Sequence, residues 1–113
     1  MEETEFLKLA DATLARLESA LDKLQVEGAV DIDYELKPGG IIEIVFEDDS
    51  KIIVNRHAAA REIWVAARSG GFHFKPPADA GGHWTGTRDG QDLAVVLSRC
   101  VSEQAGVPLR LDW

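Results

Sequence analysis

Two amphipathic helical segments bracket a series of short alternating segments, and this order constrains the fold more than any other feature of the sequence. In residues 4–24, apolar side chains recur at three- and four-residue steps, the period of one helix face. Thr4 is the expected N-cap and Gly28 the expected stop. A second apolar stripe of helical period covers residues 91–104 and ends before Gly106. Both helices therefore need an apolar partner surface, which the segments between them must supply.

The segments between the helices read as strands that form a sheet. The expected strands cover residues 29–36, 40–47, 51–55, 61–68, 71–75 and 83–87. Short polar turns at 37–40 and 47–50 predict an antiparallel meander, and the Pro- and Gly-rich residues 75–82 predict a loop. The predicted fold class is α+β, a two-layer sandwich with both helices on one face of an antiparallel sheet of five to six strands. We expect residues 1–113 to form one domain, with the other sheet face open.

The single cysteine and the hydropathy of the chain exclude several classes of protein. Cys100 lies in the apolar stripe of the second helix and is expected to be a buried thiol, so an internal disulfide and a multi-thiolate metal site are excluded. Acidic residues follow Met1 directly, and the apolar runs are too short to span a membrane. We therefore expect a cytoplasmic protein without membrane contact.

Negative charge is concentrated in the first half of the chain. Residues 1–50 hold fourteen Asp or Glu against four Lys or Arg, a net charge of −10, whereas residues 51–113 carry +2, which gives the total of −8. A field of one sign implies a cationic partner, which is a basic protein surface, metal ions, or both. It argues against nucleic acid, whose phosphates would be repelled.

The acidic residues follow helix and strand periods. Carboxylates spaced seven and four residues apart share one helix face, and alternating carboxylates leave one side of a strand. Seven are predicted to share one exposed ridge: Asp11, Glu18, Asp22, Glu27 in the connecting turn, Asp31, Asp33 and Glu35. An ordinary solvated surface is the alternative interpretation.

Hard cations such as Fe²⁺, Fe³⁺, Mn²⁺ and Ca²⁺ prefer carboxylate oxygens, so the ridge is a candidate metal site. The leading ligands are Asp11, Glu18, Asp22, Asp31 and Asp33. Because a ridge offers few ligands per ion, we expect weak binding and poor selectivity. The three histidines show no ligand spacing and are interpreted as incidental. Without a nucleophile–base pattern, a P-loop or paired Glu-x-x-His motifs, we do not expect an enzyme.

Two tryptophans lie in the predicted sheet region. In residues 61–68, Ile63 alternates with Trp64, and the Ile63 side is the expected core side. Trp64 then stands on the open sheet face, either as an interface anchor or as a partly covered structural residue. Trp84 is expected to pack locally against the sheet.

Several segments together resemble the frataxin family, specifically its bacterial CyaY-type members. They are KIIVNR at 51–56, EIWVA at 62–66, GGFHF at 70–74, Trp84, Arg88, EF at 5–6, LAD at 9–11 and QAG at 104–106. The resemblance spans nearly the whole chain. Ser19, Lys23 and Gln25 stand where richly acidic members carry carboxylates, and Ala60 replaces the proline before the Trp strand.

The resemblance implies the frataxin fold, ferrous and ferric iron binding at the acidic ridge, and a role in iron–sulfur cluster assembly. The protein would act as an iron donor in this assembly or as an iron-dependent regulator of the cysteine desulfurase, and the implied partners are that desulfurase and the scaffold protein. The expected partner-binding residues are Glu18, Asp22, Glu27, Asp31, Asp33, Asn55 and Trp64. We expect a monomer that forms oligomers with iron. The alternative is an interaction module whose metal binding is incidental.

Overall fold

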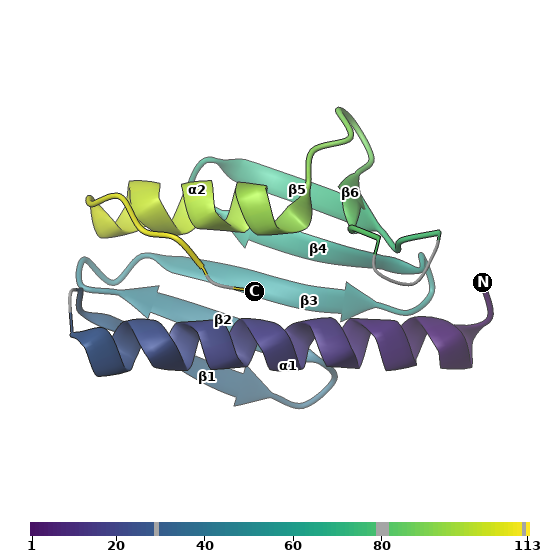
Figure 1. Ribbon diagram of the computed structural model, residues 1–113, viewed down its shortest axis with the longest axis horizontal. Helices are drawn as coiled ribbons and strands as arrows, with labels where there is room; N and C mark the ends of the chain where they lie inside the picture. Colours follow the sequence, from purple (N-terminus) through teal and green to yellow (C-terminus); the bar gives the residue numbers. More distant parts are fainter. Residues whose placement is uncertain (29, 79–81, 112) are drawn as a thin grey trace.

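The computed structural model describes residues 1–28, 30–78, 82–111 and 113, which form two layers (Figure 1). Helices α1 (Glu3–Glu27) and α2 (Leu93–Ala105) lie side by side on one face of the sheet. The described residues form six strands, β1 (Ile32–Lys37), β2 (Ile41–Phe46), β3 (Lys51–His57), β4 (Glu62–Ala67), β5 (Gly70–Lys75) and β6 (Thr85–Gly86). The predicted α+β two-layer sandwich is confirmed.

The sheet is a simple meander in which each strand pairs with the next and all pairs are antiparallel. Its two edges are β1 and the two-residue β6, which is shorter than the predicted strand at 83–87. The first strand was predicted from residue 29, which lies outside the described residues, but Val30 and Asp31 are not in the strand and β1 begins only at Ile32. Residues 79–81 of the predicted loop also lie outside the described residues. The open sheet face is therefore bounded by β1, which carries acidic side chains.

Helix α1 stops at the predicted Gly28, but it continues past the predicted end at residue 24 and begins differently. Glu2 is its N-cap and makes no side-chain cap bond, so the predicted capping role of Thr4 is wrong. At the other end, Gly28 adopts a left-handed conformation with φ 67°, and its N–H contacts Leu24 O at 3.3 Å. Glu27 is consequently the last helical residue, not part of a turn.

Helix α2 begins two residues later than the apolar stripe predicted. The carboxylate of Asp92 accepts a hydrogen bond from Ala94 N–H at 3.0 Å, which makes Asp92 the N-cap. Gly106 ends the helix in a left-handed conformation with φ 77°, as predicted. A side-chain cap decided the start because Asp92 satisfies a backbone donor that would otherwise have no partner.

The core lies between the helices and the inner face of the sheet. Alternate strand residues are buried there, and the fully buried ones include Ile42, Ile44, Ile52, Val54 and Ile63. Cys100 is buried among them as predicted, and burial raises the pKa of its thiol. Alternation of apolar side chains along β2 to β4 therefore fixes which face the helices cover.

Trp84 belongs to this core, and its contacts extend beyond the predicted local packing to helix α1. Its indole N–H donates to Thr13 Oγ1 of α1 at 2.9 Å, and its ring meets Phe6 edge to face at 5.9 Å between centroids. Thr13 thus satisfies the indole N–H of a ring that is 5% exposed. This contact joins the start of α1 to the segment between β5 and α2.

The residues after α2 pack along that helix. Ser102 Oγ accepts a hydrogen bond from Leu109 N–H at 2.9 Å, and Leu111 is 4% exposed. The predicted packing of this tail in a groove beside a helix is confirmed. Within the described part of the chain, we find no helix with the length and apolarity needed to cross a membrane.

Candidate metal and partner-binding surfaces

The predicted acidic site residues are carried by α1, by the chain leading into β1 and by β1 itself. We call them the acidic surface: Asp11, Glu18, Asp22, Glu27, Asp31 and Asp33. Glu18 is half-buried and the other five are exposed. The heptad and four-residue spacings place the helical members on the side of α1 that overhangs the edge strand β1 (Figure 1).

Two side-chain contacts connect α1 to β1 within the acidic surface. The hydroxyl of Tyr34 donates to Asp22 Oδ1 at 2.9 Å. The amide of Gln25 donates to Ile32 O at 3.0 Å and to Asp33 Oδ1 at 3.3 Å. The helix and strand carboxylates therefore gather at one edge of the molecule, as predicted.

The predicted single ridge is nevertheless divided by β1. Tyr34 pairs with the buried Ile44 and faces the helices, whereas Asp33 pairs with Val45 and is rooted on the open side of the sheet. Adjacent strand residues point to opposite sides. The carboxylates of α1 and the carboxylate of Asp33 therefore lie on either side of the edge strand. Gln25 bridges them by drawing the Asp33 carboxylate toward the end of α1.

The pKa of Tyr34 depends in part on the negative charges of Asp22 and Glu18 on α1. This pKa is raised, first by burial of the ring and then by the hydrogen bond to Asp22 and the negative charges of Asp22 and Glu18. The phenol is the only tyrosine in the sequence. It is therefore an internal reporter for any cation that binds between these two carboxylates.

Asp11 differs from the rest of the acidic surface because it has a cationic partner. The guanidinium of Arg56, from β3, forms an ion pair with Asp11 Oδ1. Gly40 permits this, since it adopts φ 75° and a Cβ there would lie 2.3 Å from Arg56 Nε. A metal ion would have to compete with Arg56 for Asp11.

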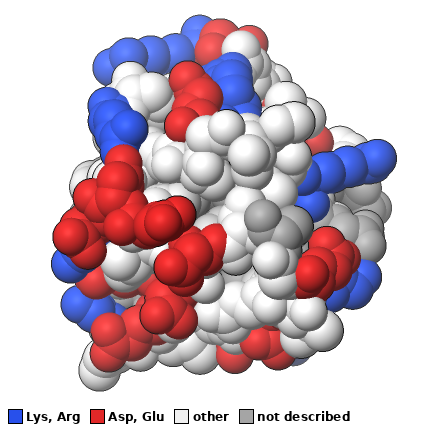
Figure 2. All heavy atoms as spheres, turned by 90° about the vertical axis from the view of Figure 1, so that its left-hand side faces the viewer, with Lys and Arg blue, Asp and Glu red and all other residues white. Residues whose placement is uncertain are grey.

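The turn between β2 and β3 adds acidic side chains that the sequence analysis treated only as turn residues. Asp31, Glu47 and Asp48 line a groove of about 660 Å³ at the end of the molecule where α1 and α2 finish. Figure 2 views this end and shows acidic side chains grouped together, with Lys and Arg mostly at the margins of the group. The register of β1 with β2, in which Ile32 pairs with Phe46, brings Asp31 beside this turn.

Asp48 in that turn is engaged in local contacts. Its pKa is lowered to about 2 by hydrogen bonds from Ser50 and by the Arg68 guanidinium, which forms an ion pair with it. Asp48 is thus a structural carboxylate of the turn, whereas Glu47 and Asp31 beside it make no such contact among the interactions described.

The carboxylates are dispersed. Among the described residues, no three His, Cys, Asp or Glu side chains lie close enough together to hold a metal ion. An ion at this surface would have few protein ligands and would keep water in its shell. The arrangement suits a readily exchanged cation or a basic protein surface.

The open sheet face carries the second predicted site. Trp64 stands there as predicted, opposite Asn55 of β3 and His73 of β5. Its indole is stacked between two imidazoles, with centroid distances of 3.9 Å to His57 and 4.4 Å to His73. The interplanar angles are 11° and 9°, so the three rings are nearly parallel.

The histidines were interpreted as incidental as metal ligands, and two of them have a packing role against Trp64. Glu62 Oε1 accepts the Trp64 indole N–H at 2.8 Å and lies 3.6 Å from His73 Nδ1, which fixes the stack to β4. A signal was present in the sequence, since His57, Trp64 and His73 fall on one side of neighbouring strands. Predicting the stack from this alternation would have required the register of β3, β4 and β5.

Glu43 occupies the same face nearer the acidic edge. It is 9% exposed and lies between Lys37 at 2.8 Å and Lys51 at 3.1 Å. Hydrogen bonds from Lys37 and then Lys51 lower the pKa of the Glu43 carboxyl. The centre of the open face is therefore compensated in charge, unlike the acidic surface.

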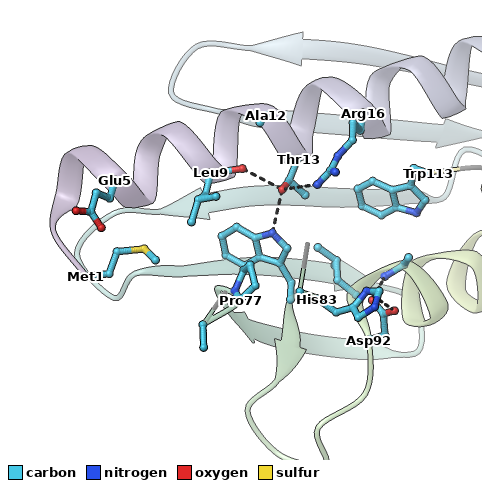
Figure 3. A pocket seen from close by; sticks show the side chains of 15 residues that line it. Met1, Glu5, Leu9, Ala12, Thr13, Arg16, Pro77, His83, Asp92 and Trp113 are labelled. Atoms are coloured by element: carbon cyan, nitrogen blue, oxygen red, sulfur yellow. Dashed lines mark hydrogen bonds and ion pairs between the residues drawn. The ribbon is translucent and has the colours of Figure 1, made fainter. Parts of the chain in front are cut away.

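A further groove of about 780 Å³ opens between the start of α1 and the start of α2 (Figure 3). Its lining is mainly apolar and includes Leu9, Trp84 and Trp113, with Arg16 at one side and His83 on the other, 3.3 Å from Asp92. It shares no residue with the acidic surface or with the stack on the open face. The groove thus plays no part in either predicted site.

Comparison with known proteins places these features in a family. A family model described as a frataxin-like domain matches residues 1–107. The chain is 51% identical over 106 residues to the iron-sulfur cluster assembly protein CyaY of Dechloromonas aromatica, covering 94% of each chain. It is 47% identical to the protein of that name from a Janthinobacterium species, covering 98% of this chain and 96% of the relative.

Solved structures of frataxins share the fold of this chain. Frataxin from Psychromonas ingrahamii superposes with a TM-score of 0.82 at 26% identity, and each chain is covered completely. Trimeric frataxin from the yeast Saccharomyces cerevisiae, complexed with ferrous, gives a TM-score of 0.72 at 25% identity, with 94% of this chain and 88% of that chain covered. From its fold, its sequence and these relatives, the chain belongs to the frataxin family.

Proposed function

We propose that this protein binds iron and acts in iron–sulfur cluster assembly, as an iron donor or as an iron-dependent regulator of a cysteine desulfurase. The observation that carries the proposal is the exposed acidic surface on α1 and β1, where Arg56 is the cation seen paired with a member, Asp11. The name of the curated relatives, iron-sulfur cluster assembly protein, supports the same role.

Iron would bind weakly at Asp11, Glu18, Asp22, Asp31 and Asp33, and other divalent cations would substitute for it. Carboxylate oxygens suit both Fe²⁺ and Fe³⁺, while the dispersed arrangement leaves most of the coordination shell to water. Weak binding suits transfer of iron to another protein better than storage. The solved yeast relative is complexed with ferrous, which makes iron the first cation to test.

The two surfaces divide the partner contacts. Glu18, Asp22, Glu27, Asp31 and Asp33 would meet a basic patch of the desulfurase, because uncompensated negative charge steers and holds a cationic surface. Asn55 and Trp64 on the open face would meet the scaffold protein by burial of side chains. We propose a cytoplasmic monomer without catalytic activity that forms oligomers with iron; one yeast relative is described as trimeric.

A second function has one observation in its favour. Since no three-ligand group is found among the described residues, the acidic surface could serve docking alone, with metal binding as a by-product of its charge. The protein would then be an interaction module. Iron would not change its affinity for the desulfurase.

Capture of the desulfurase with and without ferrous iron distinguishes the two functions. We expect iron to change the amount captured by the wild-type protein and to have no effect on a variant with Asp22→Asn and Asp31→Asn. The matched control carries Asp89→Asn and Glu103→Asn. It removes the same number of negative charges, but at positions outside the acidic surface. Capture that is equal with and without iron would favour the interaction module, and no capture at all would reject both functions.

The metal ligands are tested separately by Co²⁺, whose paramagnetism broadens nearby NMR signals. Broadening should begin at amides of residues 11–35 and at the ring of Tyr34, which lies against Asp22. Broadening centred on His57, His73 or His83 would reject the assignment of the acidic surface as the cation site.

A further inference from the structure

The groove between the starts of α1 and α2 has the size and the lining of a site for a small molecule. As the described residues define it, its volume is about 780 Å³, and ligand pockets commonly have volumes of roughly 300–1,000 Å³. Its apolar wall combines buried and half-buried side chains, namely Leu9, Trp84, Leu93 and Trp113. An apolar molecule of modest size would therefore be largely enclosed there.

Helix α1 gives the two ends of this groove opposite charges. Glu5, Leu9 and Arg16 line it from one face of the helix, and Figure 3 shows Glu5 at one end and Arg16 toward the other. At roughly 1.5 Å per residue, Glu5 and Arg16 are about 16 Å apart along the helix. An anionic group in the groove is therefore repelled at the Glu5 end and attracted at the Arg16 end.

Arg16 has donors left for a ligand. Within the described part of the chain, its guanidinium makes one long hydrogen bond, 3.4 Å from Nη2 to Thr13 Oγ1. Thr13 Oγ1 also accepts the Trp84 indole N–H and donates to Leu9 O, so the hydroxyl has no capacity left for a ligand. The guanidinium, in contrast, can offer a planar pair of N–H groups, which matches the two oxygens of a carboxylate.

Trp113 supplies a second donor near Arg16. Of the buried side-chain nitrogen and oxygen atoms in the described residues, Trp113 Nε1 is the one without a hydrogen-bond partner. A buried N–H without an acceptor costs free energy, so pairing it is favourable. Because this atom is closed to solvent, the indole has to turn before a ligand oxygen can reach the N–H. Figure 3 shows the ring at the same end of the groove as Arg16.

The second carboxylate of the lining, Asp92, is already engaged. Its Oδ1 accepts the Ala94 N–H at 3.0 Å, and its Oδ2 lies 3.3 Å from His83 Nδ1. Glu5 is thus the carboxylate of the lining for which no partner is seen among the described residues, and it lies away from Arg16 (Figure 3). The charges of the groove favour one orientation of an anionic ligand, with its head toward Arg16.

We propose that this groove binds a small organic acid, a molecule with one carboxylate and an apolar body that carries an aromatic ring. The body lies against Leu9, Trp84 and Leu93. The carboxylate is held by the Arg16 guanidinium and, once the indole has turned, by the Trp113 N–H. This site is independent of the proposed function, because the groove shares no residue with the acidic surface or with the open sheet face.

The probes are phenylbutyrate, its primary amide and phenylbutylamine, which share one apolar body and differ in the charge of the head group. At neutral pH we expect the carboxylate to bind about tenfold tighter than the amide, since its hydrogen bonds are charge-assisted, and the amine to bind more weakly than either. NMR titration measures the affinities, and the indole N–H signal of Trp113 should shift on binding. The Trp64 indole, bonded to Glu62 on the open sheet face, should not shift and is the internal control.

The variants test each donor. Arg16→Gln should remove the preference for the carboxylate and leave the affinity for the amide unchanged. Lys8→Gln is the matched control, because it removes the same charge from an exposed position of α1 outside the groove. Trp113→Phe keeps an aromatic ring without the N–H and should lower the affinity for the carboxylate about threefold. Thermal melts check that the three variants are folded.

Three outcomes would overturn the proposal: equal affinity for the carboxylate and the amide, a preference for the carboxylate that survives in Arg16→Gln, or no binding of any probe at millimolar concentration. These titrations contain neither iron nor desulfurase, so their failure leaves the proposed function standing. A failed desulfurase capture likewise says nothing against the groove.

Discussion

The acidic surface and the open sheet face are built from different kinds of contact. On the acidic surface, exposed carboxylates make few bonds, and the described contacts that restrain them come from Tyr34, Gln25 and Arg56. On the open face, Glu43 has two lysine partners and Trp64 has a ring on each side. The first surface therefore acts through charge over several ångströms, and the second through fitted contact.

The difference would let one small protein meet the two partners proposed for it. Uncompensated charge tolerates imprecise geometry, whereas fitted contact requires a partner of matching shape. Long-range attraction is screened within roughly 8 Å at physiological salt, so the two surfaces should respond differently to ionic strength.

Reversing two charges of the acidic surface should abolish desulfurase binding. Glu18→Lys with Asp22→Lys replaces attraction by repulsion, and we expect affinity to fall about 100-fold or more. Glu2→Lys with Glu103→Lys is the matched control, with the same change in net charge outside the acidic surface. Titration calorimetry at low and high salt measures both; wild-type affinity in the first variant would mean that the acidic surface is merely solvated.

Removing the ring at the centre of the stack should weaken scaffold binding by about 2 kcal/mol, with little dependence on salt. Trp64→Ala deletes an aromatic anchor that acts by burial. Ile53→Ala, on the same face, is expected to cost less and serves as the control. A salt-dependent loss for Trp64→Ala would show that the open face also acts mainly by charge.

Cations should stabilise the free protein through the acidic surface. Crowded carboxylates repel one another and destabilise the folded protein. Added Ca²⁺ or NaCl should screen this repulsion, raise the free energy of unfolding by about 1 kcal/mol and raise the melting temperature by about 4 °C. The variant with Glu18→Gln and Asp22→Asn should gain less from either salt. A melting temperature that stays flat in the wild-type protein would indicate that neighbours such as Lys23 already neutralise this surface.

Glu43 should make the stability of the folded protein decrease at acid pH. Its pKa is lowered in the folded protein, mainly by Lys37, so its stabilising contribution is present above the unfolded pKa and is lost as pH falls through the lower folded value. Glu43→Gln should lower the free energy of unfolding at neutral pH. It should also make that free energy depend less on pH in the acid range. Denaturant unfolding across this range measures the slope, and an unchanged slope would mean that Glu43 does not contribute.

The smallest expected effect is spectroscopic. Asp22→Asn removes a charge beside the sole tyrosine, so the pKa of Tyr34 should move down toward its ordinary value of 10.0, while burial keeps part of the shift. Ultraviolet absorbance during an alkaline titration records this. Glu35→Gln, on the opposite side of β1, should leave the titration unchanged.

Much of the fold could be predicted because apolar periodicity is a local property. The stripe in α1, the alternation in β2 to β4 and the stop at Gly28 each depend on residues close in sequence. The two errors at helix starts also have local causes, since the cap bond of Asp92 and the absent one at Glu2 depend on backbone geometry that periodicity does not contain.

The acidic surface was predictable as a concentration of charge, because helix and strand periods fix which side chains share a side. The pairing of α1 with β1 then decided which carboxylates are restrained: Arg56 reaches Asp11 from 45 residues away, and Asp33 is drawn to Gln25. Such contacts depend on how layers pack, which no local pattern specifies.

The sequence by itself determined the layers of this protein, its net charge of −8 and the side on which Trp64 stands. Only the tertiary structure decided that Trp84 is buried beside Thr13, that Glu43 lies between two lysines, and that two histidines enclose Trp64. The physical reason is the range of the interactions: periodicity acts over a few residues, whereas ring stacking and ion pairing require atoms within a few ångströms from strands that only folding brings together.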